Sequence, residues 1–122
     1  MKKLPETEFK IMKVAWESDP PITTGLIMES IGNENNWKIQ TVVSLMNRLT
    51  ERGFLRSEKK GKERLYYPIV EKDDYLHFET VHFMKLYHKN SFMNLVGTLY
   101  KSDTISNEDL ASLLKWVEEK RD

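Results

Sequence analysis

The first part of the chain contains two short segments with helical hydrophobic spacing. The first runs from Pro5 to about Glu17, where a proline suits the opening turn, and Asp19-Pro20-Pro21 ends it. The second has an N-cap at Thr23 or Thr24 and continues through Ile31 to a stop at Gly32-Asn33. The apolar positions that define the first helix are Phe9, Met12 and Trp16.

Residues 37–53 form a third helical segment with two unlike faces, closed by Gly53 as a natural C-cap. One face is apolar and carries Ile39, Val42, Leu45, Met46 and Leu49, with Val43 at its edge. The other carries Gln40, Thr41, Ser44, Asn47 and Arg48, with Glu51 one turn further on. Short amides and hydroxyls are poorer helix formers than Glu or Lys, so a face rich in them indicates a purpose other than helix stability.

The pattern changes to strands between residues 54 and 70. Residues 54–58 and 64–70 predict two strands, the second rich in aromatic and branched side chains. Residues 59–63 predict a charged turn between them. This segment is therefore expected to be one β-hairpin with a basic tip.

The rest of the chain returns to helical spacing. We expect helices from Lys72 to about Lys89, from Phe92 to Tyr100, and from Ser106 onward, where Asp109 suggests a capping box. The hydrophobic positions of the last two helices that we expect to form a dimerisation core are Leu95, Val96, Leu99, Leu110, Leu113, Leu114 and Val117. A C-terminal region of this size buries such a set poorly within one chain.

Composition places the chain among folded proteins. It has 122 residues, of which 39% are hydrophobic and 31% charged, a balance unlike that of disordered chains. There is no cysteine, no apolar run long enough to span a membrane and no signal peptide in MKKLPETEFK, so we expect a cytoplasmic protein without membrane contact.

Charge is distributed unevenly although the net charge is zero. Residues 37–68 contain 8 Lys and Arg against 3 acids, a net charge of +5. Residues 71–122 contain 7 Lys and Arg against 10 acids, a net charge of −3. This asymmetry predicts two parts with separate roles, residues 1–71 and residues 72–122.

The order of three helices and a hairpin predicts a mainly α fold with a small β-hairpin wing. We expect a winged helix-turn-helix domain, followed by a C-terminal helical dimerisation region. In this fold the third helix enters the major groove of double-stranded DNA, where amides and hydroxyls can reach base edges. We expect bases or phosphates to be contacted by Gln40, Thr41, Ser44 and Arg48, and the backbone by Lys38, Asn47, Lys59, Lys60, Lys62 and Arg64.

Catalytic and metal-binding patterns are absent from the sequence. It has no nucleophile elbow, phosphate loop or HExxH motif, so we expect no enzyme. His77, His82 and His88 do not share one helical face, and no cysteine assists them. We therefore expect neither a metal site nor a cofactor.

The sequence also resembles the penicillinase repressor family (BlaI/MecI), which is related to the copper-responsive CopY repressors. The residues that carry the resemblance are Glu8-Phe9-Lys10-Ile11-Met12-Lys13-Val14-Ala15-Trp16, Trp37, Thr41-Val42, Leu45, Arg48-Leu49, Arg52-Gly53-Phe54-Leu55, Lys59-Lys60-Gly61-Lys62 and Tyr66-Tyr67-Pro68. The resemblance implies a bacterial cytoplasmic repressor that binds a palindromic operator as a homodimer.

Three departures from the family pattern affect what the resemblance implies. Gln40 stands where the family commonly has a basic residue, which implies a different operator. The cysteine motif of the copper branch is missing. The Asn-Phe bond at which a regulatory protease cleaves the penicillinase branch is replaced here by Thr98-Leu99.

Two other functions remain open at this stage. One is a regulator that senses a small molecule, which a pocket lined by Tyr75, Phe78 and Phe83 would support. The other is a winged helix used for protein–protein assembly, which would show little salt dependence and no preferred DNA sequence.

Overall fold

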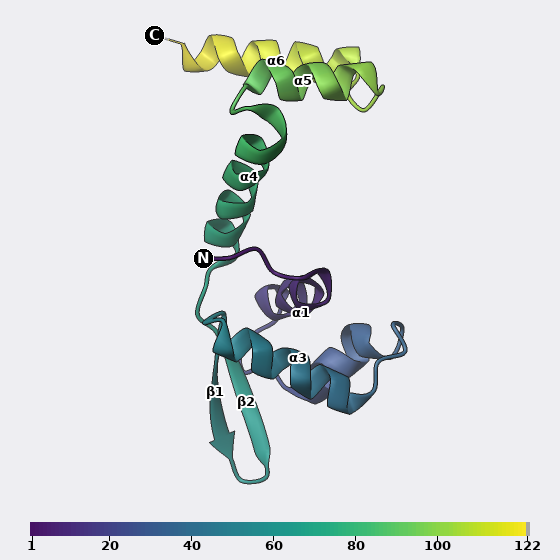
Figure 1. Ribbon diagram of the computed structural model, residues 1–122, viewed down its shortest axis with the longest axis vertical. Coiled ribbons are helices and arrows are strands. Elements are labelled where there is room, and N and C mark those ends of the chain that lie inside the picture. Colours follow the sequence, from purple (N-terminus) through teal and green to yellow (C-terminus); the bar gives the residue numbers. More distant parts are fainter. Residues whose placement is uncertain (122) are drawn as a thin grey trace. The chain divides into compact units, whose positions relative to one another are not determined.

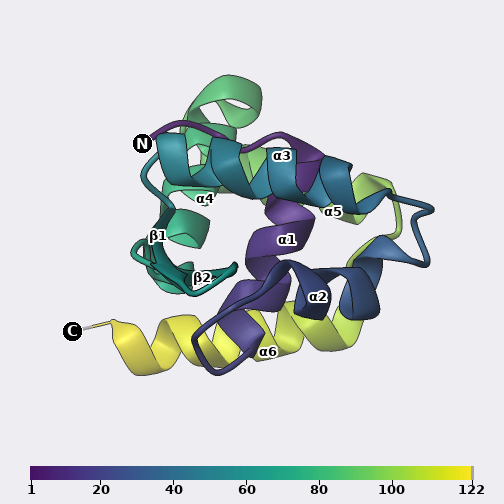
Figure 2. The same ribbon diagram turned by 90° about the horizontal axis from the view of Figure 1, so that it is seen from below.

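The protein is described here by a computed structural model covering residues 1–121. The chain forms two compact units, the first Met1–Glu79 and the second beginning at Thr80. The first unit contains α1 (Glu6–Glu17), α2 (Thr24–Ile27), α3 (Ile39–Glu51) and the hairpin of β1 (Leu55–Lys60) and β2 (Glu63–Pro68). Figures 1 and 2 show its three helices packed together and the hairpin extending from them. The expected order of a winged helix-turn-helix is confirmed.

The core of the first unit is made by the apolar faces of α1 and α3. Ile11, Met12 and Ala15 of α1 are buried together with Val42, Leu45, Met46 and Leu49 of α3. The hairpin joins this core through Tyr66, which is buried while its neighbour Tyr67 is half-buried, as strand alternation predicts. Tyr66 also exchanges both backbone hydrogen bonds with Ile22, at 2.8 and 2.9 Å, and this anchors the hairpin beside the segment that leads into α2.

The second helix differs from the continuous helix expected through Ile31. Thr23 is its N-cap, and the hydroxyl accepts a hydrogen bond from the Leu26 amide at 3.1 Å. The α-helix ends at Ile27, and a π-helical turn, Met28–Gly32, follows. A β-carbon at Gly32 would lie 2.7 Å from the sulfur of Met28, so a larger residue there would displace the Met28 side chain.

The loop of the hairpin is shorter than the sequence suggested. Lys60 pairs with Glu63, so the loop contains only Gly61 and Lys62. Gly61 has a φ of +64°, which suits the first loop position of a two-residue hairpin turn. The strand pairing therefore carries the charged side chains almost to the end of the hairpin.

The first part of α4 (Lys72–His88) belongs to the first unit. Tyr75 is fully buried, and its ring lies against Phe9, Trp16, Phe54 and Phe78. Its hydroxyl accepts a hydrogen bond from the Leu4 amide at 2.7 Å. These contacts extend the first unit to Glu79, beyond the division at residue 71 expected from the charge pattern.

The second unit contains the end of α4, α5 (Phe92–Lys101) and α6 (Asn107–Lys120). The hydroxyl of Ser91 caps α5. Ser106 and Asp109 form the expected capping box at the start of α6, at 2.8 and 3.1 Å. Within residues 1–121, no helix combines the length and the apolar character required to cross a bilayer.

Candidate nucleic-acid interface

The outer face of α3 presents the polar side chains singled out in the sequence. Gln40, Thr41, Ser44, Asn47 and Arg48 are all exposed, and we call them the reading face. Four of them, Gln40, Thr41, Ser44 and Arg48, line one shallow depression of about 300 Å³ together with the edge of Leu45. The structure therefore places the four predicted base-contacting residues together on one exposed surface of α3.

Two features at its C-terminal end hold α3 in place. Gly53 has a φ of +81°, and the Phe54 amide donates to the Leu49 carbonyl at 2.9 Å, so the chain turns sharply from the helix into β1. Nε of Arg52 donates to the buried carboxylate of Glu8 in α1 at 2.8 Å. The turn at Gly53 and the Arg52–Glu8 pair thus fix the orientation of α3 and of its reading face.

Arg48 is the only cation on the reading face. Within residues 1–121, no hydrogen bond or ion pair of the protein holds its guanidinium group. Acidic side chains are missing from the first three turns of α3, and Glu51 is its last residue. The face therefore combines neutral donors and acceptors with one free cation, a combination that suits base edges beside phosphates.

Ile39 was expected on the buried side of α3, and this expectation is wrong. The side chain is 54% exposed, whereas Val42, Leu45, Met46 and Leu49 are buried. Ile39 is the first residue of the helix, and a helical side chain leans over the turn that precedes it. No helical turn precedes Ile39, so the side chain extends past the end of the packed interface.

The hairpin, which we call the wing (residues 55–68), brings cations together through its strand register. Lys59 lies directly opposite Arg64, so two like charges share one face of the ribbon. The guanidinium of Arg64 donates to the hydroxyl of Ser57 at 3.0 Å. Like charges directly opposite each other destabilise a strand pair. The register therefore places two cations side by side on one face of the wing.

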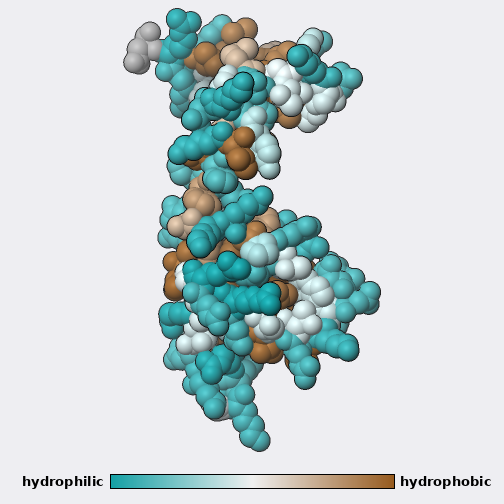
Figure 3. Space-filling view, in the orientation of Figure 1, coloured by the Kyte–Doolittle hydropathy of each residue, from teal (hydrophilic) through white to brown (hydrophobic). Residues whose placement is uncertain are grey.

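The other predicted contact residues also lie on the outside of the first unit. Lys60 pairs with Glu63 on the opposite face of the ribbon, and Lys62 occupies the two-residue loop. Lys38 immediately precedes α3 and is exposed. Figure 3 shows the wing as a hydrophilic projection of the first unit.

Sequence reasoning missed one cation, Arg56. Its guanidinium carbon lies 4.1 Å from the centre of the Tyr67 ring, and these two residues are paired across the strands. Stacking of this kind holds an arginine in one orientation. Period-two alternation alone does not identify the pair, because it follows only from the strand register.

The second unit leaves its hydrophobic residues uncovered. His88 is the only buried side chain among residues 80–121. Six of the seven residues expected in a dimer core are half-buried, and Leu114 is 60% exposed. Figure 3 shows hydrophobic side chains on the visible surface of this unit. Other exposed hydrophobic residues of α5 and α6 are Phe92, Met93, Tyr100 and Trp116.

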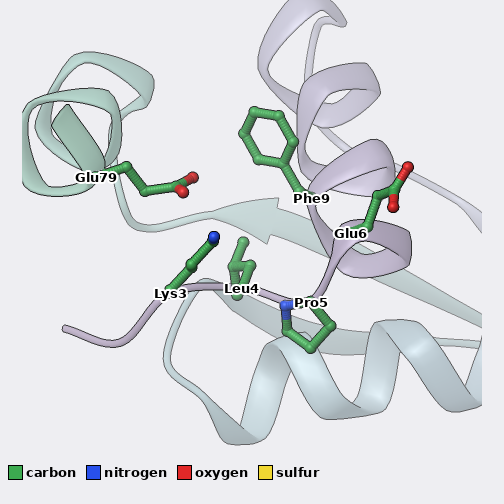
Figure 4. A pocket seen from close by; sticks show the side chains of 6 residues that line it. All are labelled: Lys3, Leu4, Pro5, Glu6, Phe9 and Glu79. Atoms are coloured by element: carbon green, nitrogen blue, oxygen red, sulfur yellow. The ribbon is translucent and has the colours of Figure 1, made fainter. Parts of the chain in front are cut away.

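Tyr75, which was expected to line the pocket of a small-molecule sensor, does not reach the surface. Its ring is fully buried in the core of the first unit, and burial raises the pKa of its hydroxyl to about 12. The Leu4 amide opposes this rise in pKa, while Glu79 adds to it. A depression of about 640 Å³ lies nearby and is lined by Lys3, Leu4, Pro5, Glu6, Phe9 and Glu79 (Figure 4). It contains none of the predicted contact residues.

His88 and Thr98 both make hydrogen-bond contacts with Asn94. Nδ1 of His88 lies 2.7 Å from Oδ1 of Asn94. Within residues 1–121, no three His, Cys, Asp or Glu side chains are grouped so that they could hold a metal ion. Thr98 and Leu99 lie inside α5, where the hydroxyl of Thr98 donates to the Asn94 carbonyl at 2.9 Å.

Comparison with known proteins identifies similar chains. The family model described as penicillinase repressor matches residues 4–119. The penicillinase repressor of Bacillus licheniformis is 25% identical over 122 residues, which cover 98% of this chain and 94% of that protein. The methicillin resistance regulatory protein MecI of Staphylococcus aureus is 24% identical over 111 residues, 91% of this chain and 89% of that protein.

Two solved structures are similar to this chain in fold and sequence. The DNA binding domain of the repressor BlaI in solution matches with a TM-score of 0.52 and 28% identity, covering 62% of this chain and 94% of that chain. The monomeric form of Bacillus licheniformis BlaI in complex with the blaP half-operator matches with a TM-score of 0.51 and 26% identity, covering 61% and 89%.

Proposed function

This chain belongs to the penicillinase repressor family, and we propose that it is a transcriptional repressor that binds a palindromic DNA operator as a homodimer. It is not an enzyme, because the family consists of DNA-binding regulators. A repressor of this kind acts in the bacterial cytoplasm, where the DNA lies.

The reading face carries the proposal. Gln40, Thr41, Ser44 and Arg48 surround one depression on the exposed side of α3, whose other side is fixed in the core. Amide side chains pair with adenine edges, hydroxyls bind base edges or phosphates, and arginine binds guanine or phosphate. In this proposal the reading face enters the major groove.

The wing and Lys38 supply affinity that does not depend on sequence. Lys59, Lys60, Lys62 and Arg64 lie at or near the hairpin tip. Contacts of lysine and arginine with phosphates release counterions, so each one makes binding more sensitive to salt. These cations hold the protein on the duplex while the reading face selects the sequence.

The homodimer is supported by the uncovered hydrophobic residues of the second unit. Leu114 and Trp116 are 60% and 57% exposed, and no hydrophobic residue between 80 and 121 is buried. A second copy of the unit would remove such residues from water. A two-fold dimer places two recognition helices about 34 Å apart, or at a multiple of that spacing, which matches a palindrome.

A regulatory protease is the remaining partner in the proposal, and α5 sets a condition on it. Proteases cut most readily in exposed loop tips, but the Thr98–Leu99 bond lies inside a helix. Cleavage at this bond therefore requires that α5 open first. Limited proteolysis of the purified protein tests this condition, and a cut at this bond in the fully folded protein would contradict it.

Selection from a pool of random DNA duplexes tests the main proposal. The purified protein is incubated with the pool, and the bound duplexes are recovered and sequenced. We expect enrichment of a palindrome with half-sites separated by a whole number of helical turns. The matched control carries Gln40→Ala and Ser44→Ala, which keeps the basic wing and removes two reading residues. It should bind the pool but lose or relax the motif.

Two outcomes would contradict the proposed function. If the wild-type protein enriches no sequence at moderate salt, its attraction to DNA is only general and the assembly-module function gains support. If the control enriches the same motif as the wild type, the reading face is assigned wrongly.

A further inference from the structure

Two exposed hydrophobic side chains on α3 are not explained by the packing of the first unit. Ile39 is 54% exposed and Val43 is 37% exposed. They are four residues apart, so they are neighbours on the helix surface. At 100° per residue, Gln40, Ser44 and Asn47 lie between this pair and the opposite edge formed by Thr41 and Arg48. The pair is thus one edge of the reading face.

Neither core packing nor helix stability accounts for this pair. Isolated exposed hydrophobic residues are common on proteins, but these two are adjacent and lie in the first two turns of α3. Both are β-branched, and β-branched residues lose side-chain freedom in a helix. Lysine or glutamate would favour the helix more and would stay hydrated. The packing and stability of the first unit therefore leave this pair unexplained.

The major groove of DNA contains one apolar group, the C5-methyl group of thymine. The N-terminal residues of a recognition helix are the ones that approach base edges. Ile39 and Val43 occupy that part of α3 and have stiff side chains, so they lose little rotamer freedom on contact. We propose that Ile39 and Val43 form an apolar edge that reads thymine methyl groups in the operator.

The neighbouring Gln40 strengthens this assignment. A glutamine pairs with the N6 and N7 edge of adenine, and adenine is the partner of thymine. Gln40 follows Ile39 directly and is exposed beside it. One stretch of α3 therefore presents groups for both members of an A·T pair, so the operator positions that it contacts should be rich in A·T pairs.

This inference rests on the proposed function, and the experiment distinguishes a failure of the inference from a failure of the proposed function. The probe is the duplex most enriched by the wild-type protein, resynthesised with uracil in place of thymine at one position at a time. Uracil lacks only the methyl group and keeps the same base pairing. At the contacted positions we expect wild-type affinity to fall about fourfold for each lost methyl group.

Three variants complete the experiment. Ile39→Ala and Val43→Ala, singly and together, should lose the difference between thymine and uracil, and both sites are exposed, so the fold is retained. Ile69→Ala is the matched control, because Ile69 is also 54% exposed but lies outside α3. It should keep the full effect of uracil.

Three other outcomes would contradict the inference or the function on which it rests. Equal affinity for thymine and uracil at every position removes the methyl-reading edge and leaves the proposed function intact. A uracil effect that persists in the double variant shows that other residues make the contact. The absence of any enriched duplex overturns the proposed function, and the inference falls with it.

Discussion

The buried carboxylate of Glu8 in α1 accepts a hydrogen bond from Nε of Arg52, the residue that closes α3, at 2.8 Å. Glu8 is 1% exposed, whereas the Arg52 side chain is 38% exposed. This ion pair joins the first helix to the end of the recognition helix. It therefore connects the stability of the first unit with the orientation of its reading face.

Removal of Arg52 should destabilise the protein. Arg52→Ala leaves the Glu8 carboxylate buried without its partner, and we expect the free energy of unfolding to fall by about 2 kcal/mol. Urea denaturation measures this change. The matched control is Glu58→Ala, because the Arg56–Glu58 pair is exposed on both sides and 3.6 Å apart, which predicts a loss below about 1 kcal/mol. Equal losses of unfolding free energy in the two variants would show that the Glu8–Arg52 pair contributes no more than an exposed pair.

Arg48 should contribute to operator binding without contributing to stability. Its side chain is exposed and has no protein partner among residues 1–121. Arg48→Ala should weaken binding to the selected operator by about 1 to 3 kcal/mol and leave urea denaturation unchanged. Fluorescence anisotropy measures the affinity, and Lys72→Ala in the same unit serves as the control. Wild-type affinity in Arg48→Ala would show that this arginine does not face the DNA.

The wing cations should affect DNA binding and hairpin stability in opposite directions. Lys59 lies opposite Arg64, so Lys59→Thr removes a repulsion and should stabilise the hairpin by a few tenths of a kcal/mol. The same change should weaken DNA binding. Lys62→Ala in the loop should lower the slope of log affinity against log salt by about one. If the slope is the same in both variants as in the wild type, the wing does not contact phosphates.

Leu114 distinguishes a dimer core from a surface of the single chain. It is 60% exposed within one chain, so Leu114→Glu has no effect on the fold of a monomer. In a dimer the new charge would be buried, and we expect the variant to sediment as a monomer at micromolar concentration. Ser112→Glu adds the same charge at another exposed position of α6 and should remain a dimer. A wild-type protein that sediments as a monomer would contradict the proposed assembly.

Tyr75 should make the protein sensitive to alkaline pH. Its pKa is about 12 in the folded protein against 10.0 for an ordinary tyrosine. Because the folded pKa is the higher one, its contribution to stability is complete below pH 10 and is lost as the pH rises towards 12. The loss amounts to about 2 to 3 kcal/mol.

A variant isolates this contribution. Tyr75→Phe keeps the ring in the core but removes the acceptor of the Leu4 amide, so it should be less stable than the wild type at pH 8. Urea denaturation between pH 8 and pH 11 should show this difference shrinking, because Tyr75 ionises in the unfolded chain before it ionises in the folded one. A constant difference would mean that folding does not raise the pKa of Tyr75.

The parts of the fold that follow from local pattern are predictable from the sequence. The buried stripe of α3, the cap at Gly53 and the capping box of Ser106 and Asp109 depend on residues only a few positions apart. The polar reading face is predictable for the same reason, since every residue opposite a buried stripe is exposed. These features need no knowledge of tertiary contacts.

The features that sequence reasoning missed depend on contacts or on strand register. The π-helical turn after Ile27 departs from the regular helical period, and no periodicity reveals it. The Lys59–Arg64 and Arg56–Tyr67 pairs follow only when the hairpin loop is known to have two residues. The exposure of Ile39 depends on where α3 begins, and helix ends are the least regular part of a helical pattern.

The separation of the two faces of α3 has an evolutionary consequence. Val42, Leu45, Met46 and Leu49 maintain the fold, while Ile39, Gln40, Val43 and Ser44 point away from the core. In the proposed function, substitutions in the second set change which DNA is bound and leave the free energy of unfolding almost untouched. Duplicated copies of such a gene can therefore acquire different targets within one cell, because each intermediate sequence still encodes a folded protein.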